Sequence, residues 1–406
     1  MDRTDNRIID IAGAVKWVGV LDYDIVTFDI VMETEFGTTY NSYFIDAKKK
    51  TIIETVQEKF WPVYLEKLKS VTNPADISYI VLDHTEPDHS GSVRHLLELA
   101  PDAIVVGSGN AIRYLEDMVP GSFKSLVVKD GDRLDLGDRT LRFVSAPNLH
   151  WPDSIYTYIE EEKLLFTCDS FGAHFCQPDL FDDEVGDYHD AFKYYFDVIL
   201  KPFSKFMLKA IDRIAPLEIE MICPGHGPVL RSTWKEKVDL SAGMARDYIS
   251  ITTGKKIRKV LITYVSAYGY TREMAEAIRI GIESAGNVEV SVLDIEKIEL
   301  GDLESEVVRC DALLVGSPTI NQNTLLPVYR LFSVINPLRD KGKLAAAFGS
   351  YGWSGEAPKI ISDNLRNLKL AVSDEIAGFK FMPDEEKTIE LVAFGTRFAR
   401  SLADCE

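Results

Sequence analysis

The feature that most constrains the fold is a change in sequence pattern near residue 254. Beyond this point, apolar runs typical of buried strands alternate with segments that carry apolar residues at helical spacing. Strands are predicted at 260–265, 288–294, 312–318 and 343–352, and helices at 271–285, 325–335 and 385–402. Such alternation is the signature of a doubly wound parallel sheet. We therefore predict that residues 254–406 form one α/β domain.

Residues 1–253 follow a mixed pattern and are predicted to form a different domain. Buried strands are expected at 79–83 and 103–107, with an amphipathic helix at about 91–99 between them. Turn signals separate β-rich runs within 125–147 and 155–169, which predicts hairpins. Residues 187–215 are predicted to form two helices interrupted at Pro202. Sheet and helix mixed in this way indicate an α/β sandwich.

Composition narrows the classes of partner. The chain has 45 basic and 64 acidic residues, and its net charge of -19 repels phosphate backbones and anionic lipid. Neither nucleic acid nor membrane is therefore an expected partner. No run approaches the roughly 20 apolar residues that span a bilayer, and the N-terminus lacks an apolar signal core, so a cytoplasmic location is expected. The 5 cysteines are never paired as CxxC, which argues against a disulfide framework or a zinc knuckle.

Histidine is confined to the first half of the chain, and four metal-capable side chains lie together there. His84, Glu86, Asp88 and His89 directly follow a predicted strand, where a helix should begin. Alternate residues of an extended segment point to the same side, so His84, Glu86 and Asp88 can converge. His89, at the start of the helix, points in a different direction. Stacking so many polar groups beside a strand has little structural purpose. The cluster predicts a metal site.

Three further candidates lie at later strand ends or in loops: His150, Asp169 and His226. His226 stands between two glycines, which let the backbone approach a buried centre. Taken alone, His226 also fits a hydrogen-bonded structural histidine, and Asp169 fits a turn or helix cap.

Three loops at predicted strand ends of the second half indicate a phosphate-bearing ligand. Residues 266–271 place hydroxyls and free backbone N–H groups at a helix N-terminus, where a terminal phosphate fits. Neither a Gly-Lys-Ser/Thr loop nor a GxGxxG fingerprint is present. Loops 316–323 and 349–356 follow later strands, at the edge where ligands of such sheets bind. Trp353 in the last loop could equally be a ligand contact or a half-buried surface aromatic.

The HxExDH run, with His150, Asp169 and His226 downstream, resembles the metallo-β-lactamase fold, and in particular its flavodiiron branch. The resemblance implies a metallo-β-lactamase-like αββα sandwich with one iron held by His84, Glu86 and His150. It implies a second iron held by Asp88, His89 and His226, with Asp169 bridging both. Hydrolases of this fold typically have histidine where Glu86 stands here, and carboxylate in place of imidazole favours iron over zinc.

The second half resembles flavodoxin, which implies an FMN site in these three loops. The residues implied to bind FMN are Ser266, Tyr268, Gly269, Tyr270, Thr271, Ser317, Pro318, Thr319, Ile320, Asn321, Ser350, Tyr351, Gly352, Trp353, Ser354 and Gly355.

The resemblance covers essentially the whole chain and implies an oxidoreductase. The expected activity is reduction of dioxygen to water, of nitric oxide to nitrous oxide, or of both, protecting an anaerobe. Electrons are expected to pass through FMN from an external donor, either rubredoxin or a reduced deazaflavin coenzyme. In this family the flavin of one subunit approaches the irons of its neighbour, so a head-to-tail homodimer or a dimer of dimers is expected. The preference between the two gases stays open.

Two other functions, and the roles of three residues, remain open. The chain could be a binuclear zinc hydrolase with a flavodoxin-like docking module, although Glu86 argues against it. It could also be a flavin electron carrier with a vestigial first half, which would require lost ligands. Asp29 stands where many family members have a histidine, which puts a gating or proton-donor role there in doubt. His174 and Tyr195 are either hydrogen-bond or proton donors to bound oxygen or polar residues of the core.

Overall fold

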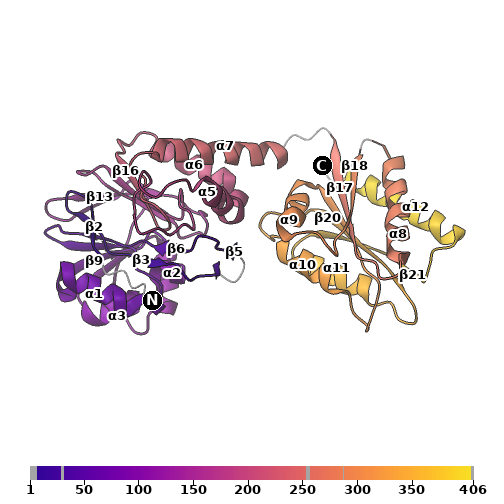
Figure 1. The fold of residues 1–406 in the computed structure, drawn as a ribbon, viewed down its shortest axis with the longest axis horizontal. Coiled ribbons are helices and arrows are strands. Elements are labelled where there is room, and N and C mark those ends of the chain that lie inside the picture. Colours follow the sequence, from indigo (N-terminus) through magenta and orange to yellow (C-terminus); the bar gives the residue numbers. More distant parts are fainter. Residues whose placement is uncertain (1–6, 29–31, 253–256, 287, 404–406) are drawn as a thin grey trace. The chain divides into compact units, whose positions relative to one another are not determined.

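The computed structural model describes residues 7–28, 32–252, 257–286 and 288–403. Contacts divide the chain into two compact units, residues 1–249 and 250–406. Both are drawn in Figure 1. The division falls in the last turn of the long helix α7 (Trp234–Thr252), a few residues before the boundary placed from the sequence. Residues 253–256, where that boundary was placed, lie outside the described residues.

The first unit contains two β-sheets. The seven-stranded sheet has the order β1 (Ile9–Ala12), β2 (Val15–Trp17), β7 (Tyr43–Ile45), β8 (Lys50–Ile53), β9 (Ile77–Val81), β10 (Ile104–Gly107) and β11 (Lys124–Val127). The five-stranded sheet has the order β12 (Arg133–Asp135), β13 (Thr140–Ser145), β14 (Ile155–Ile159), β15 (Leu164–Cys168) and β16 (Met221–Pro224). Two short pairs complete the strands: β3 (Val20–Asp22) with β6 (Thr38–Tyr40), and β4 (Thr27–Phe28) with β5 (Met32–Glu33).

The helices of this unit lie over the outer faces of the two sheets or beside their edges. They are α1 (Trp61–Val71), α2 (Pro87–Ser90), α3 (Val93–Leu99), α4 (Gly109–Met118), α5 (His189–Tyr195), α6 (Ser204–Ile214) and α7. In Figure 1, α1 and α3 lie below the seven-stranded sheet, while α6 and α7 lie above the five-stranded one. This arrangement is the predicted αββα sandwich.

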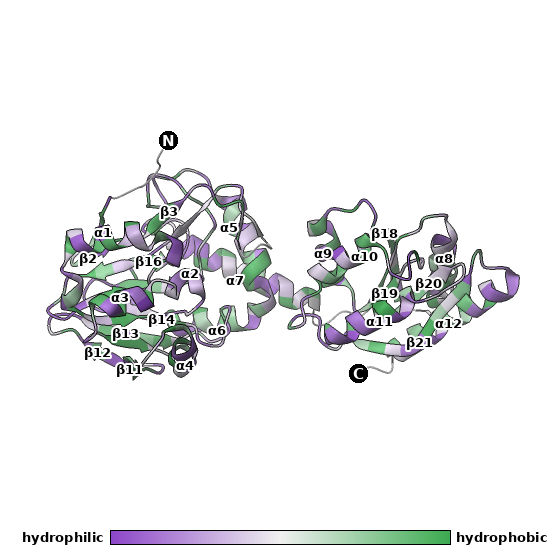
Figure 2. Cartoon of the chain, turned by 90° about the horizontal axis from the view of Figure 1, so that it is seen from below, coloured by the Kyte–Doolittle hydropathy of each residue, from purple (hydrophilic) through white to green (hydrophobic). Residues whose placement is uncertain are grey.

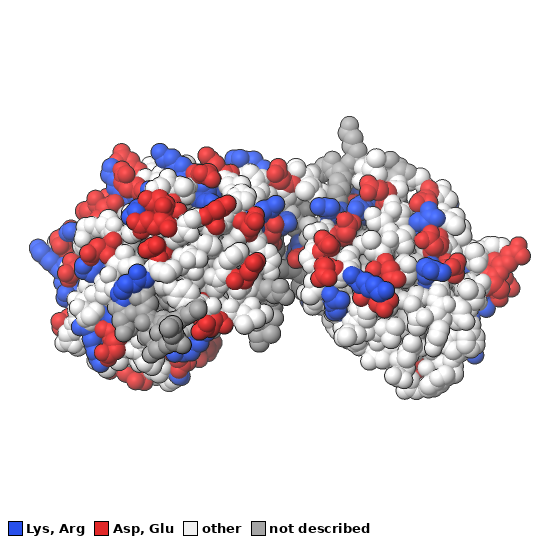
Figure 3. Space-filling model, viewed as in Figure 1, with Lys and Arg blue, Asp and Glu red and all other residues white. Residues whose placement is uncertain are grey.

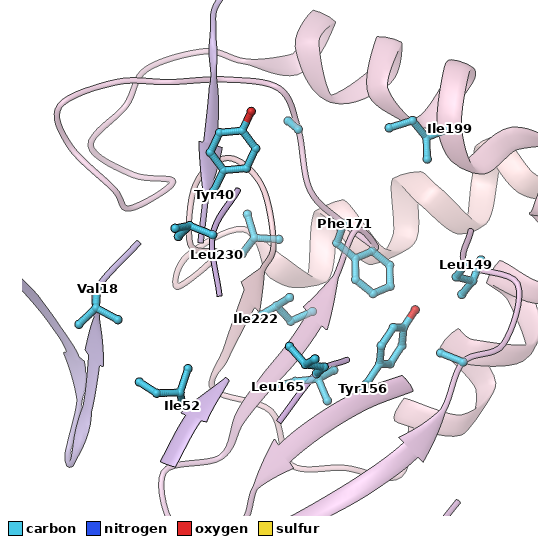
Figure 4. Packing of buried hydrophobic residues seen from close by; sticks show 14 of the residues in the cluster. Val18, Tyr40, Ile52, Leu149, Tyr156, Leu165, Phe171, Ile199, Ile222 and Leu230 are labelled. Atoms are coloured by element: carbon cyan, nitrogen blue, oxygen red, sulfur yellow. The ribbon is translucent and has the colours of Figure 1, made fainter. Parts of the chain in front are cut away.

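The core of the first unit has two parts. Between the sheets, buried side chains such as Tyr43 and Phe166 pack with their ring centroids 5.0 Å apart. A second cluster joins the sheets to the covering helices, and Figure 4 shows Tyr156 and Phe171 within it. Both of these aromatic residues are at most 1% exposed. Buried apolar surface on both faces of each sheet therefore holds the four layers together.

One prediction for this unit needs correction. The segment 125–147 is only partly a hairpin, because β11 pairs in parallel with β10, whereas β12 and β13 form the expected antiparallel pair. The helix α4 between β10 and β11 provides the crossover that a parallel pair requires. In the segment 187–215, the two predicted helices are present as α5 and α6. A π-helical turn at 196–200 and a 3-10 turn at 201–203, which contains Pro202, lie between them.

The second unit contains one parallel sheet. Its order is β18 (Val288–Asp294), β17 (Arg258–Tyr264), β19 (Ala312–Gly316), β20 (Leu344–Tyr351) and β21 (Ala371–Lys380). The helices are α8 (Tyr270–Ser284), α9 (Leu300–Arg309), α10 (Leu326–Val334), α11 (Ala357–Asn367) and α12 (Glu385–Ala403). This 2-1-3-4-5 order is that of flavodoxin-like sheets, which confirms the predicted doubly wound fold. Of these elements, α9, α11 and β21 were not predicted from the sequence.

Apolar residues line the central strands of this unit, and the helices carry both kinds of residue (Figure 2). The strand β19 is buried along its whole length, as expected of a central parallel strand. Figure 3 shows acidic and basic side chains side by side over the first unit and over the upper part of the second, whereas the lower part of the second unit's drawn face carries few charges. Among the described residues, none of the helices has the length and apolar character needed to span a bilayer.

Candidate functional site

The segment after β9 places the first four candidate ligands. Residues 82–86 leave the strand, and Pro87 then occupies the first position of the short helix α2, which carries Asp88 and His89. Proline is favoured there because its fixed φ suits a helix start and its missing N–H has no helical partner. The change from extended chain to helix turns His89 away from the direction of His84 and Glu86, as predicted. It turns Asp88 as well, so the predicted convergence of Asp88 with His84 and Glu86 was wrong: Asp88 lies with His89 and His226 instead.

One group of candidate ligands contains His84, Glu86, His150 and Asp169. Their ligand atoms lie within 4.8 Å of one another. The Oε2 atom of Glu86 is 3.3 Å from Nε2 of His84 and 2.8 Å from Nε2 of His150. Oδ2 of Asp169 lies 3.5 Å from Nε2 of His150. Two imidazoles and two carboxylates therefore converge on one point.

A second group contains Asp88, His89 and His226. The Oδ2 atom of Asp88 lies 3.3 Å from Nε2 of His89 and 3.0 Å from Nε2 of His226. The other carboxylate oxygen of Asp169, Oδ1, lies 3.3 Å from Nε2 of His89 and 3.6 Å from Nε2 of His226. Asp169 thus directs one oxygen to each group. The structure brings all seven predicted ligands together around this carboxylate.

The donor set fits a pair of cations. Both carboxylate oxygens of Asp88 and Oδ2 of Asp169 are buried and have no hydrogen-bond partner. A buried carboxylate oxygen without a donor is costly, and a metal ion removes that cost. Carboxylate oxygen mixed with imidazole nitrogen is a donor set that suits non-haem iron.

The electrostatics of the protein alone favour ionised carboxylates and positive charge beside them. Burial raises the pKa of Glu86 and of Asp169, but their histidine neighbours more than offset this and hold both pKa values below the usual range. Burial lowers the pKa of His84, yet its hydrogen bonds to Asp153 and Glu86 raise that pKa to about 10. Positive charge in this centre is therefore strongly stabilised, as a metal site requires.

Asp153 supports His84 and was not identified from the sequence as a functional residue. This carboxylate is fully buried, and its Oδ2 lies 3.1 Å from Nδ1 of His84. It also accepts hydrogen bonds from the backbone N–H of Thr85 at 2.8 Å and from the Thr85 hydroxyl at 2.7 Å. Holding Nδ1 in this way leaves Nε2 directed at the group of candidate ligands. The only sequence signal that could have identified Asp153 is its position three residues after His150.

Glu54 supports the other end of the same segment and was also missed. It follows β8 and accepts hydrogen bonds from the backbone N–H groups of Asp83 and His84. Its Oε2 atom lies 3.3 Å from Nδ1 of His89. The third imidazole, His226, donates from Nδ1 to the backbone oxygen of Thr39 at 2.6 Å. Three of the four candidate histidines therefore have their outer nitrogen held by an oxygen.

Gly225 and Gly227 allow the backbone to approach the centre closely. A β-carbon on Gly225 would lie 2.6 Å from Cε1 of His89. Gly227 has a φ of 75°, and a β-carbon there would lie 2.5 Å from the backbone oxygen of Ala173. No other residue fits either position without displacing its neighbours, which explains the glycines on both sides of His226.

His174 and Tyr195 lie beside the second group. The Tyr195 hydroxyl donates to Oδ1 of Asp169 at 3.0 Å. Nδ1 of His174 lies 2.9 Å from the Thr38 hydroxyl, while its Nε2 is buried without a partner. Burial, and then the charge of His226, lower the pKa of His174 well below its usual value, so this imidazole is neutral. Asp29 lies outside the described residues.

The remaining histidines are remote from this centre. His95 pairs with Glu58 at 3.0 Å and stacks on Trp61, and His189 is exposed at the start of α5.

The second unit has a cavity of about 530 Å³ at the carboxyl ends of its strands. Eleven of the residues predicted to bind FMN line it: Tyr268, Tyr270, Pro318, Thr319, Ile320, Asn321, Ser350, Tyr351, Gly352, Trp353 and Ser354. Gln322 and Phe381 also line it and were not predicted. Ser266, Gly269, Thr271, Ser317 and Gly355 do not line it.

The residues outside the cavity lining have distinct positions. Thr271 and Ser317 are fully buried, and the Thr271 hydroxyl lies 2.9 Å from that of Ser350, so it ties the first loop to the third. Gly269 has a φ of 87° and precedes α8, whose N-terminus no side chain caps. The Ser266 hydroxyl is buried without a hydrogen-bond partner beside this helix start. Unpaired donors at a helix N-terminus fit the terminal phosphate of a flavin mononucleotide.

Comparisons with known proteins match both units. A profile described as ODP family beta lactamase matches residues 38–227, and the flavodoxin profile matches residues 262–395. Flavo-diiron protein FprA2 of Clostridium acetobutylicum is 40% identical, over 95% of this chain and 97% of that protein. A nitric oxide reductase of Moorella thermoacetica is 34% identical, over 98% of this chain and 99% of its own length.

Solved structures show the same two-domain architecture. Rubredoxin oxygen:oxidoreductase from Desulfovibrio gigas matches with a TM-score of 0.71 and 29% identity, covering 98% of this chain and 99% of that one. The flavodiiron protein from Giardia intestinalis matches with a TM-score of 0.68 and 31% identity, covering 98% of this chain and 97% of that one.

Proposed function

Since this chain belongs to the flavodiiron protein family, we propose that it reduces dioxygen to water, nitric oxide to nitrous oxide, or both. It is an oxidoreductase, and the predicted cofactors, FMN and a diiron centre, are confirmed by this membership. The proposed role is protection of an anaerobe from oxygen or nitrosative stress.

The observation that carries the proposal is the position of Asp169 between two histidine and carboxylate groups. We propose that His84, Glu86 and His150 hold one iron, that Asp88, His89 and His226 hold the other, and that Asp169 bridges them. The oxygens of Asp169 directed to opposite groups support this assignment.

When bound, the two irons can supply two electrons and reduced FMN two more, which matches the four electrons needed to convert dioxygen to two waters. Reduction of two nitric oxide molecules to nitrous oxide needs only two. The side chains around the site set the conditions for this chemistry. The Tyr195 hydroxyl holds a proton at hydrogen-bond distance from Asp169, and the unpaired Nε2 of the neutral His174 can hold another.

The two groups differ in their access to solvent. The side chains of His150 and Glu86 are 21% and 12% exposed, whereas those of His89 and His226 are each 2% exposed. Substrate therefore reaches the centre from the side of His150 and Glu86. On the side of His89 and His226, the low exposure strengthens the electrostatic interactions between the charges.

The finer identity of the partners is part of the proposal. We propose that electrons come from an external donor. Rubredoxin and a reduced deazaflavin coenzyme are the two candidate donors, and the name of the Desulfovibrio gigas relative includes rubredoxin. We also propose the head-to-tail homodimer, or a dimer of two such dimers.

The binuclear hydrolase is not favoured. Its relatives would be hydrolases, whereas the relatives of this whole chain are flavodiiron proteins and reductases.

Substitution Glu86→Ala tests the proposal. It should lower the iron content and abolish oxygen and nitric oxide consumption with a chemically reduced donor, while FMN content stays unchanged, because the flavin cavity is built entirely from residues 268–381. Glu98→Ala, at an exposed position of α3, serves as the matched control. Unchanged gas uptake by Glu86→Ala would refute the diiron assignment. Zinc without iron, together with ester hydrolysis in the absence of reductant, would favour the hydrolase.

A further inference from the structure

One aromatic residue of the flavin cavity comes from outside the three predicted loops. Phe381 directly follows β21, whereas the other lining residues belong to the segments that follow β17, β19 and β20 or to the ends of the flanking elements. No pattern in the sequence distinguishes this phenylalanine from those of the core. Its contribution to the cavity is visible only once β21 is paired beside β20.

The backbone of Phe381 is held in an unusual conformation. Its φ is 56°, which is rare for a bulky residue because the β-carbon crowds the following carbonyl. The conformation is fixed by a hydrogen bond from its N–H to the backbone oxygen of Tyr351 at 2.9 Å. Tyr351 also pairs with Lys380 at the end of the β20–β21 ladder. The chain therefore turns at Phe381 so that its side chain faces the cavity.

The phenylalanine ring lies against the third flavin loop. A β-carbon on Gly352 would lie 3.5 Å from the ring of Phe381, so the ring packs directly on this glycine backbone. Despite that contact, Phe381 is 59% exposed, and Tyr268 and Trp353 on the same cavity are 79% and 78% exposed. Three aromatic side chains left open to water around one cavity indicate a surface that a flat apolar ligand covers.

We propose that Phe381 contacts the isoalloxazine ring of FMN, anchors it against the Gly352 loop and excludes water from it. This inference rests on the proposed function, because that function supplies the flavin. An apolar cover disfavours the negative charge that reduced flavin carries in water. Phe381 therefore tightens FMN binding and lowers the reduction potential of the bound flavin.

Substitution Phe381→Asn separates a flavin contact from a structural role. Asparagine tolerates positive φ, so the backbone is relieved of strain while the ring is lost. The dissociation constant of FMN, measured by quenching of flavin fluorescence on addition to the apoprotein, should rise about tenfold. The reduction potential of the bound flavin, measured by redox titration, should become less negative. Phe381→Tyr, which keeps the ring, should restore both values.

Two further variants complete the experiment. Phe381→Gly relieves the same strain and should show the same two changes. Ile389→Ala changes a residue on α12 that is 65% exposed and does not line the cavity, so its FMN affinity and potential should match the wild type. Wild-type values for both Phe381→Asn and Phe381→Gly would overturn the inference. Failure of the wild-type protein to bind FMN would instead overturn the proposed function on which it rests.

Discussion

At the scale of single residues, a small number of buried carboxylates have several hydrogen bonds each, and their removal has calculable consequences. Asp153 and Asp340 are both fully buried, one in each unit. Each carboxylate is held by at least three donors, so neither can be replaced by a neutral side chain without leaving donors unpaired.

Asp153→Asn should weaken iron binding about 10- to 100-fold, as is typical when the partner of a ligating histidine is changed. An amide has one acceptor oxygen and cannot serve both the Thr85 donors and Nδ1 of His84. Iron retention during dialysis against a chelator measures the effect, with the exposed Asp190→Asn on α5 as control. Equal retention in both variants would show that Asp153 has no part in orienting His84.

Asp340 should make the stability of the second unit sensitive to acid. Burial raises the pKa of this carboxyl, but the hydrogen bond from Arg339 and the charge of Lys343 lower it by a larger amount. The pKa in the folded protein therefore lies below its usual value. The stabilisation is therefore complete above the unfolded pKa, about 3.9, and is lost as pH falls through the lower folded value.

Asp340→Asn tests this pH dependence. It should reduce the free energy of unfolding at pH 7 by about 3 kcal/mol, since it leaves the buried Arg339 without this partner. It should also flatten the loss of stability below about pH 4. Urea unfolding between pH 3 and 7 measures both, with Asp374→Asn at an exposed position as control. A variant as acid-sensitive as the wild type would contradict the assignment.

At the scale of elements, α8 and α12 cross with their backbones in close contact. A β-carbon on Gly281 would meet the backbone oxygen of Val392, and one on Gly395 would meet that of Ile278. The Thr396 hydroxyl donates to the Gly281 oxygen at 3.0 Å across the same crossing. The helices can pack this closely only because glycine stands on both sides.

Gly281→Ala and Gly395→Ala should each destabilise the second unit by about 1–3 kcal/mol through overpacking. Gly301→Ala in α9, where a β-carbon meets no atom within 4 Å, should leave stability unchanged or raise it. Thermal unfolding followed by circular dichroism compares the three variants. If Gly281→Ala were as stable as Gly301→Ala, the close crossing would have no energetic role.

Elements with strong periodicity were predictable, whereas weakly patterned ones were not. The apolar runs of β17, β19 and β20 and the amphipathic α8 were identified because burial imposes their pattern. The strand β21 was missed because only one of its ten residues is buried at the sheet edge, so no apolar run marks it. The pairing of β11 with β10 was missed because a turn signal indicates a reversal but not the partner strand.

At the scale of the whole molecule, the chain contains separate hydrophobic cores in its two units. Each unit should therefore respond to its own cofactor. We expect two calorimetric transitions: iron removal should lower the first unit's transition, and FMN removal the second unit's. A ligand at 100 times its dissociation constant stabilises its unit by about 2.7 kcal/mol. One cooperative transition that shifts equally with either cofactor would contradict this expectation.

By itself, the sequence determined the two fold classes, the family and the set of candidate ligands. These properties are encoded locally, in the periodicity of apolar residues and in the HxExDH run. Only the tertiary structure identified Asp153 and Glu54 behind the histidines and Phe381 at the flavin cavity. Each acts through residues up to tens of positions away in the chain, and such contacts depend on how the strands pair and pack. Local patterns do not record that pairing, because the same short segment can fold beside different partners.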